Sequence, residues 1–262
     1  MKLPLFQVDA FTDTLFSGNP AAVCPLVTWL PDTTLQAIAE ENNLSETAFY
    51  VSAGREFHIR WFTPTVEVDL CGHATLAAAH VILNHTGHES NSVHFTSKSG
   101  PLSVVRDTDY LVMDFPAQRP EGRQIPAELI AALGREPLEL FSSADYMAVF
   151  HDEDALLSIQ PGFELLKKLD LRGVIITAPG RATDFVSRFF APKFGINEDP
   201  VTGSAHCLLA PYWSERLGKS RLTGRQLSQR GGEVVCEIRG DRVSLAGKAV
   251  TYLEGLITIV AP

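Results

Sequence analysis

Two distant stretches of the chain carry nearly the same sequence. Residues 60–74 read RWFTPTVEVDLCGHA, and residues 188–205 read RFFAPKFGINEDPVTGSA. The arginine, the second aromatic residue and the proline that open the two stretches are 128 residues apart, whereas the glycine and alanine that close them are 131 apart. The second copy therefore carries a three-residue insertion. A self-match near half of the chain length predicts two similar halves, each built on one strand–turn–helix unit.

The bulk composition is that of a globular protein and excludes several functions. The 262 residues suffice for one large domain or two smaller ones, and 45 % hydrophobic content supports a sizeable core. A net charge of −9 with scattered lysine and arginine would repel a phosphate backbone, so nucleic-acid binding is not expected. The N-terminus lacks a signal-peptide pattern, and no apolar run is long enough to span a membrane. Four widely spaced cysteines favour free thiols, so we expect a cytoplasmic protein.

Short apolar segments predict an α+β fold in which, in each half, a curved sheet wraps one long helix. The helices expected in the first half are residues 33–41 and 72–83, and the strands are 5–11, 21–26, 45–51, 56–62, 93–97, 102–106 and 110–115. The helices expected in the second half are 127–133, 162–169 and 203–217, and the strands are 173–178, 185–190, 234–238, 242–246 and 257–261. Three prolines in residues 116–128 predict a linker, which gives halves at 1–116 and 128–262, with a last strand that can cross back to the first half.

Each repeated stretch ends in a glycine that is predicted to open a helix. A helix N-terminus presents unpaired N–H groups and a partial positive charge, and glycine lets a ligand approach the backbone closely. Gly72 with His73, and Gly203 with Ser204, could therefore hold a carboxylate or a developing enolate. Either glycine alone is better explained as a tight turn. The duplication, with a polar residue after each glycine, favours the binding role.

Two carboxylates stand near these turns. Asp199 lies five residues before Ser204, where it could cap the helix or accept a hydrogen bond from a substrate. Glu46 begins an otherwise apolar strand, where partial burial would suit a general acid/base, although an exposed strand end also fits. Glu46 lies 14 residues before Arg60, and the same count back from Arg188 reaches Val174. The sequence thus predicts an acid in the first half alone.

No cofactor site is expected from the sequence. Four histidines, His80, His85, His88 and His94, lie within fifteen residues, but their spacing fits no metal site and predicts surface positions. The glycine fingerprint of dinucleotide-binding proteins and the phosphate-binding loop GxxxxGK(S/T) of nucleoside triphosphatases are both absent from the sequence. We therefore predict no nucleotide, pyridoxal phosphate or metal cofactor.

Several blocks together resemble the PhzF-like isomerases of phenazine biosynthesis. These are QVDAF, GNPAAV, NLSETAFYV, RWFTP, CGHAT, RFFAPKFGINEDPVTGSAHC and SQRGG, which follow the family's order over nearly the whole chain. Each is weakly specific alone, and the set is strongly specific. The resemblance implies the diaminopimelate epimerase-like fold, with two pseudo-symmetric halves and an active site between them. It also implies cofactor-independent proton transfer on a small carboxylic acid, and commonly a homodimer.

The resemblance also assigns residues. The family's acid/base glutamate falls on Glu46, and its substrate-contacting histidine falls on His73, beside Gly72. Its aspartate and serine fall on Asp199 and Ser204, the latter beside Gly203. Glu46 is thus the predicted catalytic residue, and the others are predicted to bind the substrate.

Two alternatives compete with this hypothesis. Racemases and epimerases of the same superfamily use two cysteines, one before each glycine turn, but here Cys71 is matched by Thr202. A hydroxyl is a far weaker acid than a thiol of pKa about 8.5, and Cys207 lies past Gly203, where it cannot readily substitute. A two-thiol epimerase is therefore disfavoured. The other alternative is a catalytically idle descendant that binds a small carboxylate or a protein, against which the intact set Glu46, His73 and Asp199 argues.

Overall fold

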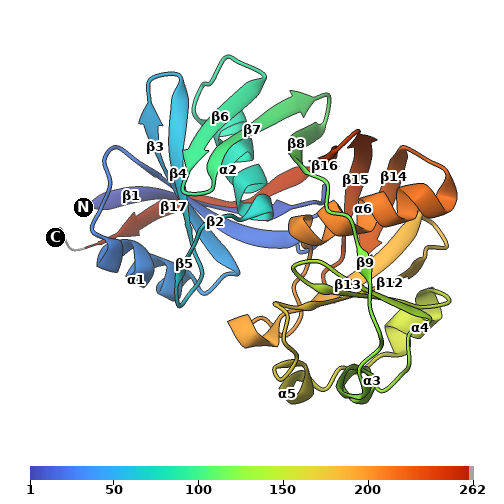
Figure 1. The fold of residues 1–262 in the computed structure, drawn as a ribbon. Helices are drawn as coiled ribbons and strands as arrows, with labels where there is room; N and C mark the ends of the chain where they lie inside the picture. Colours follow the sequence, from blue (N-terminus) through green and yellow to red (C-terminus); the bar gives the residue numbers. More distant parts are fainter. Residues whose placement is uncertain (260–262) are drawn as a thin grey trace. The chain divides into compact units, whose positions relative to one another are not determined.

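The computed structural model describes residues 1–259 of the chain. The chain forms two compact units (Figure 1). The first unit is Met1–Asp114 together with the segment that begins at Ala246, and the second is Phe115–Leu245. The end of the chain belongs to the first unit because β17 (Ala249–Thr258) pairs antiparallel with β1 (Lys2–Ala10) over the whole length of β1.

The first unit is a mixed sheet with two helices. Its remaining strands are β2 (Asn19–Leu26), β3 (Glu46–Ala53), β4 (Glu56–Phe62), β5 (Glu67–Val68), β6 (Ser92–Ser97), β7 (Gly100–Asp107) and β8 (Tyr110–Pro116), the last of which reaches the boundary. Its helices are α1 (Asp32–Asn42) and α2 (Gly72–His85). The pairing alternates: β1 with β2 is antiparallel, β2 with β3 parallel, β3 with β4 antiparallel, β4 with β6 parallel, and β6 with β7 antiparallel.

The second unit repeats this order. Its strands are β9 (Glu121–Gly122), β10 (Glu139–Ser142), β11 (Tyr146–Val149), β12 (Val174–Pro179), β13 (Phe185–Phe190), β14 (Arg221–Gln226), β15 (Gly232–Arg239) and β16 (Arg242–Gly247). Its helices are α3 (Ala127–Leu133), α4 (Glu153–Ser158), α5 (Phe163–Leu166), the 3₁₀ helix η1 (Pro192–Phe194) and α6 (Gly203–Leu217). From β10 to β15 the pairing again runs antiparallel, parallel, antiparallel, parallel and antiparallel. The repeat seen in the sequence is therefore a repeat of topology.

One buried helix lies at the centre of each unit. Along α2, Ala74 and Ala77–Ala79 are fully buried, and their small side chains let the helix pack closely against strands β1, β2 and β3. In the second unit α6 packs against β14 and β15 and buries Trp213. A helix that is apolar on nearly every side must be covered by its own sheet. The predicted α+β class, a curved sheet around a central helix, is confirmed.

The sequence missed or misplaced elements that lack a continuous apolar pattern. Residues 116–128 hold β9 and the start of α3. Helix α5 covers only Phe163–Leu166 of the predicted 162–169, and β10, β11, α4 and β14 were not predicted. Strand β17 starts eight residues before the predicted 257–261, of which 260 and 261 lie outside the described residues. Most of β17 is exposed or half-buried, which removes the alternation that marks a strand.

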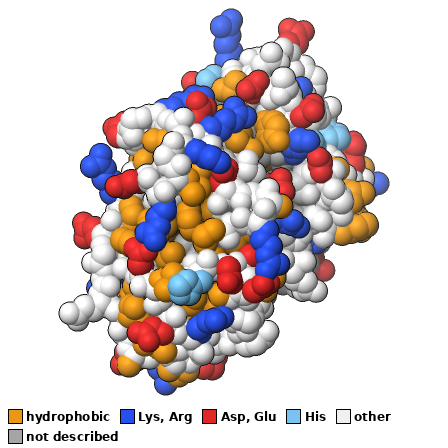
Figure 2. Space-filling model, turned by 90° about the vertical axis from the view of Figure 1, so that its right-hand side faces the viewer, with side chains coloured by type: hydrophobic (Ala, Val, Ile, Leu, Met, Phe, Trp, Pro, Cys, Tyr) orange, Lys and Arg blue, Asp and Glu red, His pale blue; other side chains and the backbone are white. Residues whose placement is uncertain are grey.

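The surface of the described chain is mixed in charge. Lysine and arginine side chains alternate with aspartate and glutamate on the face drawn in Figure 2. Among the described helices, none is both long and apolar enough to cross a membrane.

Candidate active site

The first glycine turn brings the start of β3 beside the start of α2. Glu46 is the first residue of β3, and Gly72 is the first residue of α2, as predicted. Cys71 precedes the helix in an extended conformation, with φ −144° and ψ 110°. This conformation ends the preceding loop and starts the helix, so His73 lies in its first turn, with only 6 % of its surface exposed.

Glu46 and His73 face each other. Oε2 of Glu46 lies 3.1 Å from Nε2 of His73, and the two side chains are 12 % and 7 % exposed. The two atoms are not aligned for a hydrogen bond, and neither has another hydrogen-bond partner in the described protein. A nearly buried carboxylate oxygen next to an imidazole therefore remains able to accept a proton, as a general base must.

The other ring nitrogen of His73 is held by two side chains that the sequence had not singled out for it. Nδ1 lies 3.3 Å from Nδ2 of Asn19 and 3.5 Å from Sγ of Cys71. Asn19 is fully buried at the start of β2, within the block GNPAAV. An amide NH₂ group can only donate, so in the neutral ring Nδ1 accepts this bond and Nε2, on the side of the ring that faces Glu46, carries the proton.

Burial and charge shift the ionisation of this group. Burial, followed by the charge of Glu46, raises the pKa of the Cys71 thiol to about 11, so the thiol is neutral near pH 7. Burial opposes a positive charge on His73, but its contacts with the Cys71 sulfur and with the charged Glu46 carboxylate raise the pKa of His73 well above its usual value. The surroundings of the pair therefore favour positive charge.

These three residues also form a group of potential metal ligands. Glu46, Cys71 and His73 each offer one donor atom, and the three atoms lie within 4.8 Å of one another. Among the described residues, the four clustered histidines do not form such a group. His85 and His94 are exposed, whereas His80 is half-buried and burial lowers its pKa to about 4, so the prediction of surface histidines holds only in part.

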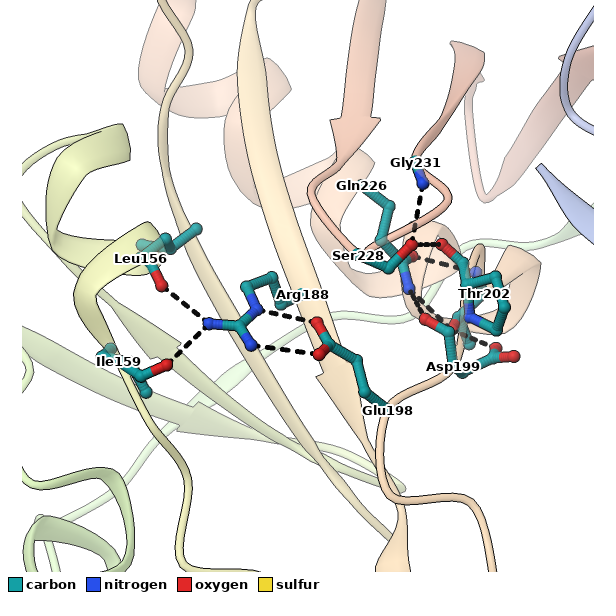
Figure 3. Close-up of polar contacts among 10 residues, drawn as sticks. Leu156, Ile159, Arg188, Glu198, Asp199, Thr202, Gln226, Ser228 and Gly231 are labelled. Atoms are coloured by element: carbon teal, nitrogen blue, oxygen red, sulfur yellow. Dashed lines mark hydrogen bonds and ion pairs between the residues drawn. The ribbon is translucent and has the colours of Figure 1, made fainter. Parts of the chain in front are cut away.

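The second glycine turn is organised by a buried glutamine (Figure 3). Oε1 of Gln226 accepts a hydrogen bond from the backbone N–H of Thr202 at 2.9 Å. Its Nε2 donates to the carbonyl of Asp199 at 2.7 Å and to the hydroxyl of Thr202 at 3.2 Å. The hydroxyl of Thr202 in turn donates to Oδ2 of Asp199. The backbone donor fixes the amide orientation, so the whole chain of hydrogen bonds points toward the Asp199 carboxylate.

Ser204 is held by a different group. Nη2 of Arg172 donates to Oγ of Ser204 at 3.0 Å, while the same guanidinium binds Asp145 through two hydrogen bonds of 2.9 and 2.5 Å. These hydrogen bonds raise the pKa of Arg172, so its charge is permanent. Sequence reasoning missed Arg172, Asp145 and Gln226, because no repeated motif contains them.

An arginine–glutamate fork precedes both turns and corrects the sequence alignment. Arg60 binds Glu67 at 2.7 and 2.9 Å, and Arg188 binds Glu198 at 2.7 and 3.0 Å (Figure 3). Each glutamate lies five residues before its glycine. The three extra residues therefore come before Glu198, near η1, and Asp199 stands at the position equivalent to Val68.

The sheet register also corrects the partner of Glu46. Phe62 pairs with Thr47, and the equivalent Phe190 pairs with Val174, so Glu46 corresponds to Gly173 instead of Val174. A Cβ atom at Gly173 would lie 2.7 Å from the ring of Phe189. The second unit thus has no room for a side chain at this position, and the prediction of an acid in one half alone gains a steric reason.

Comparison with known proteins identifies the family. The family model of phenazine biosynthesis-like proteins, PhzC-PhzF, matches residues 8–255. The chain belongs to this family. An uncharacterized isomerase of Pseudomonas aeruginosa is 54 % identical over 98 % of this chain and 99 % of its own. A PhzF-family protein structure from Enterococcus faecalis has a TM-score of 0.97 and 48 % identity, covering 99 % of this chain and 100 % of that one.

A more distant structure shares the fold alone. The crystal structure of a hydroxyproline epimerase from Agrobacterium vitis has a TM-score of 0.64 at 12 % identity, and covers 100 % of this chain and 94 % of that one. The predicted epimerase-like fold and the predicted family are therefore both confirmed. The family relatives place the chain among isomerases.

Proposed function

We propose that this isomerase moves a proton between two carbons of a small carboxylic acid, cyclic or amino, without a cofactor, and that Glu46 is its acid/base. The contact between Oε2 of Glu46 and Nε2 of His73 carries the proposal, since both atoms are buried and neither is used in a protein hydrogen bond. The kinship with proteins that are named isomerases supports it.

In the proposed mechanism one carboxyl group does both proton transfers. The Glu46 carboxylate removes a proton from a carbon beside the double bond of an unsaturated acid, and the electron pair left behind spreads into that conjugated system. The same carboxyl then returns the proton to another carbon on the same face. The product has the composition of the substrate, with the double bond shifted.

The other site residues are assigned to binding. His73, with Nε2 on the side of Glu46, orients the carboxyl and the substrate, and the N–H groups around Gly72 can attract a carboxylate. In the other unit, the N–H groups around Gly203 have the same capacity. Asp199 accepts from a substrate amine or hydroxyl, and Ser204, which accepts from Arg172, still has a hydroxyl proton to donate. These roles follow the family resemblance.

The geometry of Thr202 supports one base over two. A two-base epimerase needs a second acid/base just before the second glycine. The hydroxyl of Thr202 occupies that position and donates its proton to Asp199. Thr202 is thus engaged in a structural hydrogen bond at the place where the epimerases carry a thiol.

Proton exchange in deuterated water tests the proposal. A panel of cyclic and amino carboxylic acids is incubated with the enzyme in deuterated water, and deuterium at carbon is measured by mass spectrometry. For the acid that the wild type labels, we expect Glu46→Gln to slow exchange by about 10²- to 10⁴-fold, because the amide keeps the shape but removes the base. Glu41→Gln, on the exposed side of α1, is the matched control and should keep the wild-type rate.

Two results would count against the proposal. Unchanged labelling by Glu46→Gln would remove Glu46 from the mechanism. Binding of acids by the wild type without any exchange at carbon would support the catalytically idle descendant instead.

We also propose a homodimer, as the resemblance implies. Strand β17 exposes Tyr252 and Leu256, at 47 % and 64 %, and the ring of Phe16, 68 % exposed, packs edge-on against Tyr252. Such an apolar surface is typical of a contact with another chain. Light scattering that finds only a 28.7 kDa species would contradict the homodimer.

A further inference from the structure

We propose that Glu46, Cys71 and His73 bind one zinc ion, and that zinc reversibly inhibits the enzyme by occupying its base. The inhibition rests on the proposed function of Glu46, whereas the binding does not. Zinc has no role in the proposed reaction.

The geometry points to a cation at this position. The facing atoms of Glu46 and His73 lie 3.1 Å apart, and neither has a hydrogen-bond partner in the described protein. Buried polar atoms without partners are costly, and an ion that both can bind would remove this cost. Sγ of Cys71 lies close by, with all three donors within 4.8 Å of one another.

The donor set selects zinc among the common divalent ions. A thiolate, an imidazole and a carboxylate are the usual zinc ligands, whereas magnesium and calcium prefer oxygen alone. Bond lengths of about 2.0–2.3 Å place neighbouring donors on a tetrahedral zinc roughly 3–4 Å apart. Nε2 of His73 and Oε2 of Glu46 already have this separation, and a donor set that includes the Cys71 sulfur lies within 4.8 Å. Three protein ligands leave the fourth position to water or to a substrate carboxylate.

Zinc binding displaces the proton of the Cys71 thiol and prevents Glu46 from accepting a proton from the substrate. The Cys71 thiol releases its proton to solvent when its sulfur coordinates the ion. The proton on Nε2 of neutral His73 moves to Nδ1, toward which the Asn19 amide turns its oxygen, and the ion then balances the charges of the thiolate and the Glu46 carboxylate. A carboxylate oxygen that coordinates zinc cannot accept a proton from a substrate carbon. Removal of the ion by a chelator restores both groups.

Metal binding can be measured without knowledge of the substrate. The full chain, first treated with chelator, is titrated with zinc chloride by calorimetry and with cobalt chloride by absorption spectroscopy. We expect one ion per chain and a thiolate-to-cobalt charge-transfer band. Cys71→Ser should abolish the band and weaken zinc binding by at least about 100-fold, since even changes behind the ligands cost 10- to 100-fold. Serine is a favourable residue before a helix, so α2 should still start at Gly72.

Controls separate this site from surface binding and from the proposed function. Cys207→Ser, which changes a buried thiol on α6, and His94→Gln, which removes an exposed histidine, should both bind zinc like the wild type. Zinc binding that survives in Cys71→Ser, or that is lost in His94→Gln, would overturn the proposal. An enzyme that binds zinc through Cys71 yet exchanges protons equally fast with and without zinc would refute the inhibition, and would also question the role of Glu46.

Discussion

The two glycine turns share a scaffold and differ in every group that could react. In both, an extended residue precedes the glycine, the helix starts at the glycine, and an arginine–glutamate fork lies five residues upstream. A side-chain hydrogen bond is also repeated, since the side chains of Thr75 and His206, at equivalent positions, donate to the carbonyls of Cys71 and Thr202.

The difference lies in what surrounds each turn. The first turn gathers a glutamate, a thiol and a histidine, and two of the atoms that face each other have no hydrogen bond. The second turn is closed by hydrogen bonds, because Gln226 and Thr202 together direct Asp199. The first turn is therefore suited to move protons, and the second is suited to hold a carboxylate in one orientation. The two turns share their backbone geometry and differ in the side chains that surround it.

The largest expected effect on stability tests whether the two forks are equivalent. Arg188 also donates to the carbonyls of Leu156 and Ile159, both at 2.9 Å, so Arg188→Met leaves these and Glu198 without their donor. We expect a loss of about 3 kcal/mol in the free energy of unfolding, measured in urea.

The matched variant in the first unit should be milder. In Arg60→Met, Glu67 keeps its contact with Lys98 at 2.5 Å, and the other carboxylate partner, Asp32, is exposed to water. We expect a loss of about 1–2 kcal/mol. Equal losses in the two variants would show that the forks contribute alike and that the backbone contacts of Arg188 add nothing.

A smaller effect tests whether the Thr202 hydroxyl is structural. Thr202→Val keeps the shape but removes the proton that Asp199 accepts, and also the acceptor of Gln226. We expect a loss of about 2 kcal/mol in unfolding free energy, because a buried carboxylate loses a donor. Thr202→Ser retains the hydroxyl and should stay within about 1 kcal/mol of the wild type. An unfolding free energy of Thr202→Val equal to that of the wild type would show that the Thr202 hydroxyl does not stabilise the second turn.

The smallest expected effect is the pH dependence of stability that the Arg60–Glu67 fork causes. Hydrogen bonds from Arg60 lower the pKa of Glu67 from 4.5 to about 2. A group whose pKa is lower in the folded state adds stability above its unfolded pKa and loses it as the pH falls toward its folded pKa. Between pH 5 and pH 3 we therefore expect the wild type to lose about 1–2 kcal/mol more than Glu67→Gln, after allowance for screening by solvent. Parallel acid unfolding curves for the two proteins would contradict this.

Local sequence signals predicted the elements that are buried and regular. Strands β4 and β13 and helices α3 and α6 have the predicted bounds, and α2 starts at the predicted glycine. The start of strand β17 was not predicted because most of its residues are exposed or half-buried. Pairing with β1, which is far away in sequence, determines this strand instead. The sequence predicted that Glu46 and His73 belong to one site, but it did not predict that they contact each other. Their facing atoms, and the approach of Asn19 and Cys71 to Nδ1, join segments that no local pattern links.

The sequence by itself determined the repeat, the family and the residue types at both turns, because these are properties of letters and spacing. Only the tertiary structure decided which positions are equivalent. A one-residue difference in hairpin length moves the partner of Glu46 from Val174 to Gly173, and the paired forks move the insertion ahead of Glu198. Counting along the chain cannot detect either shift, since register is set by hydrogen bonds between strands and by side chains that meet across the fold.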